Sequence, residues 1–105
     1  MTSRTILNWV EMNPKRYYKD GKIQGLMSTK EVDGITYIGC MADGLFTYNM
    51  IKDIIMLYET RVICLIVDTK SEQELIRRAL SRYSFRYEYR DDIMYAIGDR
   101  LWVAE

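Results

Sequence analysis

The sequence predicts one α/β (α+β) domain, built on a mixed, mostly antiparallel sheet with helices on both faces. Three features predict this class: two early Asp-Gly turns, a wholly apolar segment from Val62 to Val67, and helical periodicity on either side of that segment. The chain has 105 residues, which suits a single domain spanning 1–105. The expected order is helix, three strands, helix, strand, helix and two strands.

The first half of the chain is predicted to form a short helix and three antiparallel strands. Residues 5–12 carry apolar side chains at helical spacing, and the helix ends before Pro14 because the residue preceding proline avoids the α region. Asp20-Gly21 and Asp33-Gly34 can supply the positive φ values that tight hairpin turns require. The strands around these turns are predicted at residues 16–18, 22–27 and 35–41.

The second half is predicted to continue the sheet through a crossover helix. Residues 47–59 repeat apolar side chains at intervals of three and four, as an amphipathic helix does. Val62–Val67 is apolar throughout, which is typical of a central strand covered on both faces. Right-handed crossover places it parallel to the strand at 35–41.

The last elements are predicted to be a capped helix and a hairpin. Ser71 and Glu74 have the spacing of a capping box, and the helix they open buries its apolar stripe around Ile76. Residues 85–89 and 93–97 then form two strands around the turn Asp91-Asp92.

Composition excludes several classes of function. The chain has 15 Lys and Arg against 15 Asp and Glu, so no overall field attracts it to nucleic acid or to a membrane surface. It has no His, which excludes Ser-His and Cys-His catalysis and His-ligated zinc. Cys40 and Cys64 lie in apolar segments and are too few for a four-cysteine site, so no metal is expected. A reducing, cytoplasmic setting fits these thiols.

Three stretches of the chain, residues 17–25, 35–67 and 79–87, resemble the GNAT superfamily of N-acetyltransferases in element order and hydrophobic pattern. The chain also resembles the shortened acetyltransferase-like domains of internal virion proteins of short-tailed bacteriophages. This resemblance implies a viral or phage accessory protein, located in the host cytoplasm or the virion.

The resemblance also implies where acetyl-coenzyme A would bind. In the superfamily a glycine-rich loop wraps the pyrophosphate, and here the corresponding stretch is 41–47. Gly44 matches the loop pattern, whereas Met41 replaces a basic residue, Phe46 replaces a small one and Asp43 adds negative charge. The candidate cofactor-binding residues are therefore Gly44, Phe46 and Thr47. The alternative is an ordinary turn in which Thr47 caps the helix, with no cofactor.

The position that the superfamily's general acid would occupy is Leu80, which cannot donate a proton. Tyr83 is the candidate replacement, and the alternative is that Tyr83 covers the core as an amphipathic lid. The residues at these loop and general-acid positions favour a protein that is not an enzyme. The alternative is an acyl-coenzyme A-dependent N-acetyltransferase with a degenerate loop.

A second group of candidates combines arginine with tyrosine, the residues enriched at protein interfaces. These partner-binding candidates are Arg78, Arg82, Arg86, Tyr87 and Tyr89. The preferred function is binding of a partner protein or a second copy of the chain. A solvated helix face is the plain alternative. A nucleic-acid-binding module using the segment from Arg77 to Arg90 is a further one, opposed by the neutral net charge and the interspersed Glu residues.

Overall fold

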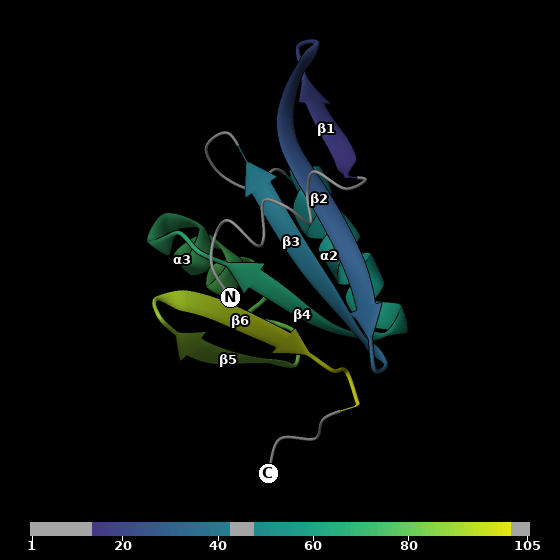
Figure 1. The fold of residues 1–105 in the computed structure, drawn as a ribbon, viewed down its shortest axis with the longest axis vertical. Helices are drawn as coiled ribbons and strands as arrows, with labels where there is room; N and C mark the ends of the chain where they lie inside the picture. Colours follow the sequence, from purple (N-terminus) through teal and green to yellow (C-terminus); the bar gives the residue numbers. More distant parts are fainter. Residues whose placement is uncertain (1–13, 43–47, 102–105) are drawn as a thin grey trace.

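A six-stranded mixed sheet organises the part of the chain that the computed structural model describes, residues 14–42 and 48–101 (Figure 1). The helix predicted at residues 5–12 lies outside these residues. The described elements are β1 (Lys15–Lys19), β2 (Lys22–Val32), β3 (Ile35–Ala42), α2 (Tyr48–Thr60), β4 (Val62–Val67), α3 (Lys70–Ala79), β5 (Phe85–Arg90) and β6 (Ile93–Gly98).

The strands lie in the order β1-β2-β3-β4-β6-β5. β3 and β4 pair in parallel through the crossover helix α2, and the other neighbouring pairs are antiparallel. The predictions of an α/β class, a mostly antiparallel mixed sheet and a central Val62–Val67 strand are therefore confirmed.

The two Asp-Gly turns form as predicted, with φ of 53° at Asp20, 76° at Gly21, 51° at Asp33 and 81° at Gly34. Between them β2 is longer than predicted and runs for 11 residues, up to the second turn. β1 has only five residues and pairs with β2 no further than Met27. The remainder of β2 is therefore paired with β3 alone among the described strands.

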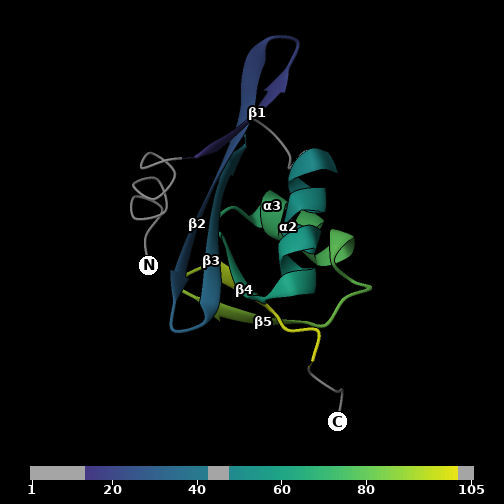
Figure 2. The same ribbon diagram turned by 90° about the vertical axis from the view of Figure 1, so that its right-hand side faces the viewer.

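Both described helices cover the same face of the sheet (Figure 2). The core on this face joins Ile63 and Leu65 of β4 to Ile54 of α2 and Ile76 of α3. The predicted helices on both faces are not found in the described residues. The reason is topological: the crossovers from β3 to β4 and from β4 to β5 progress in the same direction along the sheet, so right-handed connections put both helices on one side.

The opposite face carries a second cluster of buried residues, Cys64, Ile66, Ile93 and Tyr95. Alternation along β4 sends successive side chains to the two clusters, and Ile63 to Val67 are all at most 5% exposed. Full burial of such a side chain stabilises the fold by about 1.5–3 kcal/mol. Because both faces of β4 are buried, its sequence is apolar throughout.

The N-cap of helix α3 lies two residues before the predicted cap, Ser71. Thr69 is its N-cap, although the Thr69 side chain makes no capping hydrogen bond, and Glu72, rather than Glu74, is the third helical residue. Thr69 and Glu72 have the same spacing as Ser71 and Glu74, so the sequence pattern occurs twice and the helix begins at the upstream copy.

The buried amide of Gln73 joins three elements. Its Nε2 donates to the carbonyl oxygen of Val67 at 3.0 Å and to that of Asp92 at 2.8 Å. The first turn of α3 is thereby fixed to the end of β4 and to the turn between β5 and β6.

At the far end of β6, Gly98 lies directly under two aromatic rings. Tyr58 stacks on Phe85 with ring centroids 5.0 Å apart, and the Tyr58 hydroxyl accepts a hydrogen bond from the Ser84 amide at 3.0 Å. A Cβ on Gly98 would lie 2.5 Å from the Phe85 ring and 2.9 Å from the Tyr58 ring. Only glycine fits this position without displacing the aromatic pair.

Replacing Gly98 with alanine should therefore destabilise the protein. We expect G98A to lower the free energy of unfolding by roughly 1–3 kcal/mol, because overpacking forces the rings apart. Urea denaturation measures the loss. The double variant G98A with Phe85→Leu should cost less than the sum of the two single variants, since the smaller side chain removes the clash. Unfolding of G98A at the wild-type urea concentration would show that the aromatic pair tolerates a Cβ at this position.

Candidate functional site

The arginine and tyrosine candidates lie on α3, on the segment that follows it and on β5, but they do not share one face. Tyr87 packs against the core under the helices, whereas Arg86, one position earlier, pairs with Ile97 on the opposite face. Arg78 is exposed on α3, and Arg82 is exposed just beyond its end. Strand alternation thus separates Arg86 from the predicted group.

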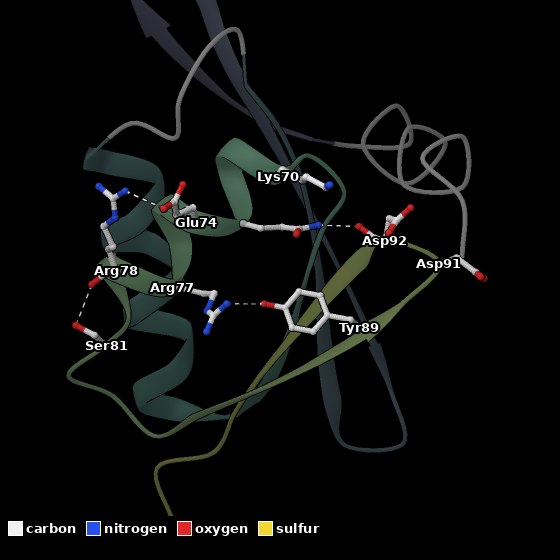
Figure 3. A pocket seen from close by; sticks show the side chains of 9 residues that line it. Lys70, Glu74, Arg77, Arg78, Ser81, Tyr89, Asp91 and Asp92 are labelled. Carbon is white, nitrogen blue, oxygen red and sulfur yellow. Dashed lines mark hydrogen bonds and ion pairs between the residues drawn. The ribbon is translucent and has the colours of Figure 1, made fainter.

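Arg77 contacts both Tyr87 and Tyr89, and its contact with Tyr89 is visible in Figure 3. Its Nη1 donates to the Tyr89 hydroxyl at 3.1 Å, and that hydroxyl donates to the Met94 sulfur at 3.5 Å. The Arg77 guanidinium also lies 5.6 Å from the centre of the Tyr87 ring, within the range of a cation–π contact. The sequence indicated Arg77 only as the first residue of a possible nucleic-acid-binding segment. In the structure, Arg77 contacts both tyrosines of this surface.

Arg77 and Tyr89 border a hollow of about 1070 Å³ between α3 and the β5–β6 turn. Its charges balance: three cations face three carboxylates. The lining residues are Lys70, Gln73, Glu74, Arg77, Arg78, Ser81, Tyr89, Asp91 and Asp92. Arg78 forms an ion pair with Glu74 at 3.1 Å along the helix. The hollow offers hydrogen bonds and paired charges to a ligand.

Tyr83, the candidate catalytic residue, packs against the core as a structural residue does. Tyr83 packs edge-on against Tyr58, with ring centroids 5.5 Å apart, and lies half-buried over the core. Leu80 is fully buried. The loop candidates Gly44, Phe46 and Thr47 lie outside the described residues.

Neither thiol is prepared for nucleophilic chemistry. Burial raises the pKa of the Cys40 thiol far above its ordinary value, and Glu72 adds to the effect. Burial also raises the pKa of Cys64 to about 11, with Arg90 opposing the rise and Glu88 adding to it. Because the thiolate is the reactive form, both side chains act as small core residues at neutral pH.

A groove that no sequence pattern singled out lies between α2 and β2, with a volume of about 810 Å³. The charged lining residues are Lys15, Lys30, Asp53 and Arg61, and the rest of the lining comes from Met27, Ser28, Thr29, Met56, Leu57 and Thr60. Met56 is 55% exposed on the side of α2 that otherwise carries polar residues such as Asp53. An apolar side chain on a polar helix face is the signal that could have revealed this groove.

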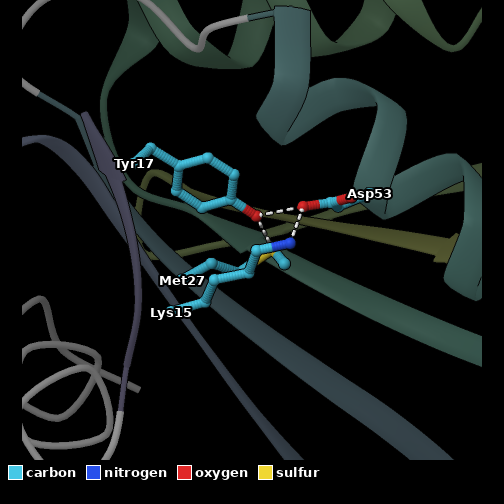
Figure 4. Close-up of polar contacts among 4 residues, drawn as sticks. All are labelled: Lys15, Tyr17, Met27 and Asp53. Carbon is cyan, nitrogen blue, oxygen red and sulfur yellow. Dashed lines mark hydrogen bonds and ion pairs between the residues drawn. The ribbon is translucent and has the colours of Figure 1, made fainter. Parts of the chain in front are cut away.

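Asp53 lines the groove and is bonded to Lys15 and Tyr17 (Figure 4). Its Oδ2 accepts a hydrogen bond from Lys15 Nζ at 2.6 Å and another from the Tyr17 hydroxyl at 2.6 Å. Burial acts to raise the pKa of this carboxyl, but the bonds from Lys15 and Tyr17 outweigh it and lower the pKa overall. Burial and the Asp53 bond raise the pKa of Tyr17, so the phenol stays neutral. The cluster joins β1 to α2.

Among residues 14–42 and 48–101, no three His, Cys, Asp or Glu side chains come together as metal ligands would. In the same part of the chain, neither helix has the length and apolar character required to span a membrane. No model of a known protein family, no curated protein and no solved structure matches the chain at a significant level.

The Lys15–Tyr17–Asp53 cluster predicts a pH-dependent contribution to stability. Because the folded-state pKa of Asp53 is lowered, its contribution is present above the ordinary aspartate pKa of about 3.9 and is lost as the pH falls through the lowered value. We expect Asp53→Asn to lower the free energy of unfolding by about 1 kcal/mol at pH 7.

Urea unfolding at pH 7 and pH 2.5 measures this difference between wild type and variant, which should shrink at the lower pH. Glu59→Gln, on an exposed residue of the same helix, is the matched control and should leave the unfolding curve unchanged. An Asp53→Asn effect that is equal at both pH values would show that the charge of Asp53 does not stabilise the fold.

Proposed function

We propose that the protein is a non-catalytic, acetyltransferase-like domain that acts by binding a partner protein through the surface formed by α3 and β5. The observation that carries the proposal is the Arg77–Tyr89 contact, which holds a half-exposed aromatic ring in the hollow that exposed Arg78 also lines. Tyrosine and arginine in fixed, partly exposed positions are the residues that most often dominate binding energy at protein interfaces.

The fixed orientation of Tyr89 favours binding. Its hydroxyl contacts both Arg77 and Met94, so its rotamer is set before a partner arrives. A side chain that is ordered in advance loses less conformational entropy on binding than a mobile one. Tyr89 is 50% exposed, which leaves one side of the ring available for contact.

The charge of the surface favours a protein partner over a nucleic acid. Binding to a phosphate backbone needs an excess of cations. In the hollow, Lys70, Arg77 and Arg78 are instead balanced by Glu74, Asp91 and Asp92. A surface that carries both signs suits another protein with the complementary arrangement.

The non-catalytic part of the proposal rests on the residues at the positions where the resemblance would place chemistry. Leu80 is in the core, and Tyr83 is packed against Tyr58. The parallel pair of β3 and β4 joined by α2 supports the acetyltransferase-like part. The viral or phage origin stays a prediction from the resemblance.

Affinity capture with quantitative mass spectrometry tests the binding surface. The wild-type chain should recover a stoichiometric partner from its cell of origin, and the double variant Arg78→Glu with Tyr89→Ala should lose it by roughly tenfold or more, because each residue alone is worth up to several-fold. The matched control is Lys22→Glu with Tyr18→Ala, which makes the same chemical changes on the exposed β1–β2 hairpin. Retention of the partner by the first variant, with loss in the control, would overturn the assignment of the surface.

Titration with acetyl-coenzyme A tests the absence of catalysis. We expect no saturable heat up to millimolar ligand, because the corresponding loop has Met41 and Phe46 where the superfamily has a basic and a small residue. Isothermal calorimetry gives the answer directly. Saturable micromolar binding that is weakened by Gly44→Trp would instead favour the N-acetyltransferase alternative.

A further inference from the structure

The two edge strands of the described sheet, β1 and β5, differ in how they discourage pairing with another chain (Figure 1). β1 has a register shift between Tyr17 and Tyr18, and its charged side chains are all cations: Lys15, Arg16 and Lys19. Bulges and like charges are two means by which proteins keep an edge strand from joining a second sheet. β5 has neither, because its register with β6 is regular and it carries charges of both signs.

The outer side of β5 is accessible. β6 is its only neighbour among the described strands. Four of the six residues of β5 are exposed: Arg86, Glu88, Tyr89 and Arg90. An accessible strand edge presents main-chain donors and acceptors that can pair with another extended segment.

The β5–β6 hairpin shows which main-chain groups of β5 point outward. Arg90 and Ile93 close the two-residue turn at Asp91-Asp92, and the residues that close such a turn exchange hydrogen bonds with each other. In an antiparallel pair this orientation alternates from one residue to the next. The residues whose main-chain groups point away from β6 are therefore Phe85, Tyr87 and Tyr89.

Two main-chain hydrogen bonds at the start of β5 agree with this orientation. The Ser84 carbonyl oxygen accepts from the Asp99 amide at 3.2 Å, so Ser84 continues the series that points inward. The Phe85 amide donates to the Tyr83 carbonyl oxygen at 2.9 Å. At the outer edge, Phe85 therefore offers only its carbonyl oxygen, whereas Tyr87 and Tyr89 each offer a donor and an acceptor.

The sequence of β5 is complementary to itself in one antiparallel register. A second copy at this edge must pair outward-pointing residues with one another, related by a two-fold axis. Centring the pair on Tyr87 uses every outward residue: Tyr87 faces Tyr87 of the second copy, and Phe85 faces Tyr89. This register also places Arg86 opposite Glu88 of the second copy, twice by symmetry. Centring it on Arg86 or on Glu88 would instead put two like charges directly opposite each other, which is unfavourable.

The other charged groups near β5 are compatible with this register. Arg90 lies at the end of the strand, 3.9 Å from Glu88 and over the Tyr95 ring at 4.8 Å, and it would face uncharged Ser84 of the second copy. On the face toward the helices, the side chains that meet are aromatic, and cross-strand aromatic pairs stabilise a sheet. Arg77 already contacts Tyr87 and Tyr89 of its own chain on that face.

We propose that the protein forms a dimer in which the outer edges of β5 from two copies pair antiparallel about a two-fold axis at Tyr87, joining the two sheets into one. Main-chain hydrogen bonds hold the strands together, and the Arg86–Glu88 pairs fix their register. This proposal does not rest on the proposed function, because Arg86 and Glu88 lie on the face of the sheet away from the hollow beside α3.

Analytical ultracentrifugation of the purified chain tests the proposal by a charge swap. The wild type should dimerise in a concentration-dependent way. Arg86→Glu and Glu88→Arg should each weaken the dimer by roughly tenfold, because each variant puts two pairs of like charges opposite each other. The double variant Arg86→Glu with Glu88→Arg should recover the wild-type affinity, and an equimolar mixture of the two single variants should form a heterodimer.

The matched control is Lys19→Glu, which reverses one exposed charge on β1, the strand at the other edge of the sheet, and should dimerise as the wild type does. A wild type that stays monomeric at millimolar concentration would overturn the proposal. A double variant no tighter than the two single variants would also overturn it, because the register would then not depend on the Arg86–Glu88 pairs.

Disulfide cross-linking measures the register directly. Residues opposite each other in such a pair have Cα atoms about 4.5 Å apart, whereas diagonal neighbours are about 7–8 Å apart, beyond the usual reach of a disulfide. A mixture of Arg86→Cys and Glu88→Cys should therefore cross-link on mild oxidation, while each variant alone should not. Cross-linking of each variant alone to the same extent as the mixture would contradict the register. Cys40 and Cys64 are buried, and the wild type serves as the control for them.

One further variant separates this dimer from binding in the hollow beside α3. Arg78 lines that hollow, so Arg78→Glu should dimerise as the wild type does. Loss of the dimer in Arg78→Glu would place the second copy in the hollow and overturn the assignment to the β5 edge. Because these measurements use the purified chain alone, their result is independent of whether a partner protein is captured.

Discussion

β4 is hydrogen-bonded on both of its edges, in parallel to β3 and antiparallel to β6, and its side chains are buried on both faces. The three-stranded meander and the C-terminal hairpin share a sheet only because β4 lies between them. The positions of the helices follow from the same strand: α2 enters it from β3, and α3 leaves it at Val67, where Gln73 bonds the last carbonyl. The α3–β5 surface and the α2–β2 groove each border one of those two helices.

Much of the fold was predictable because its signals are local. An Asp-Gly pair specifies a tight turn by its own backbone preferences, and a strand buried on both faces has no polar side chain to place. The position of the helices depends instead on the direction in which the chain crosses the sheet, which no residue encodes by itself. The predicted start of α3 was wrong by two residues because Thr69 and Ser71 precede glutamates at equal spacing, and only burial of Glu72 and Gln73 selects between them.

The candidate site was likewise predictable only in part. Composition identified arginines and tyrosines suited to an interface, but strand alternation places Arg86 on the far face, and Arg77, not Arg82, orders the tyrosines. The α2–β2 groove was not predicted, because it exists only where a short strand ends beside a longer one and a helix from further along the chain lies across them. The sequence signal for this groove was Met56, an apolar residue on a polar helix face.

The central place of β4 also has a kinetic consequence. The β2–β3 and β5–β6 hairpins close over two-residue turns, so their strands meet at little cost in chain entropy. β4 must instead find β3 across the whole of α2, and β6 across α3 and β5. Non-local pairing of this kind slows folding. We therefore expect the insertion of this one strand between the two hairpins to limit the refolding rate, with the apolar residues of both hairpins open to solvent and to neighbouring chains until it occurs.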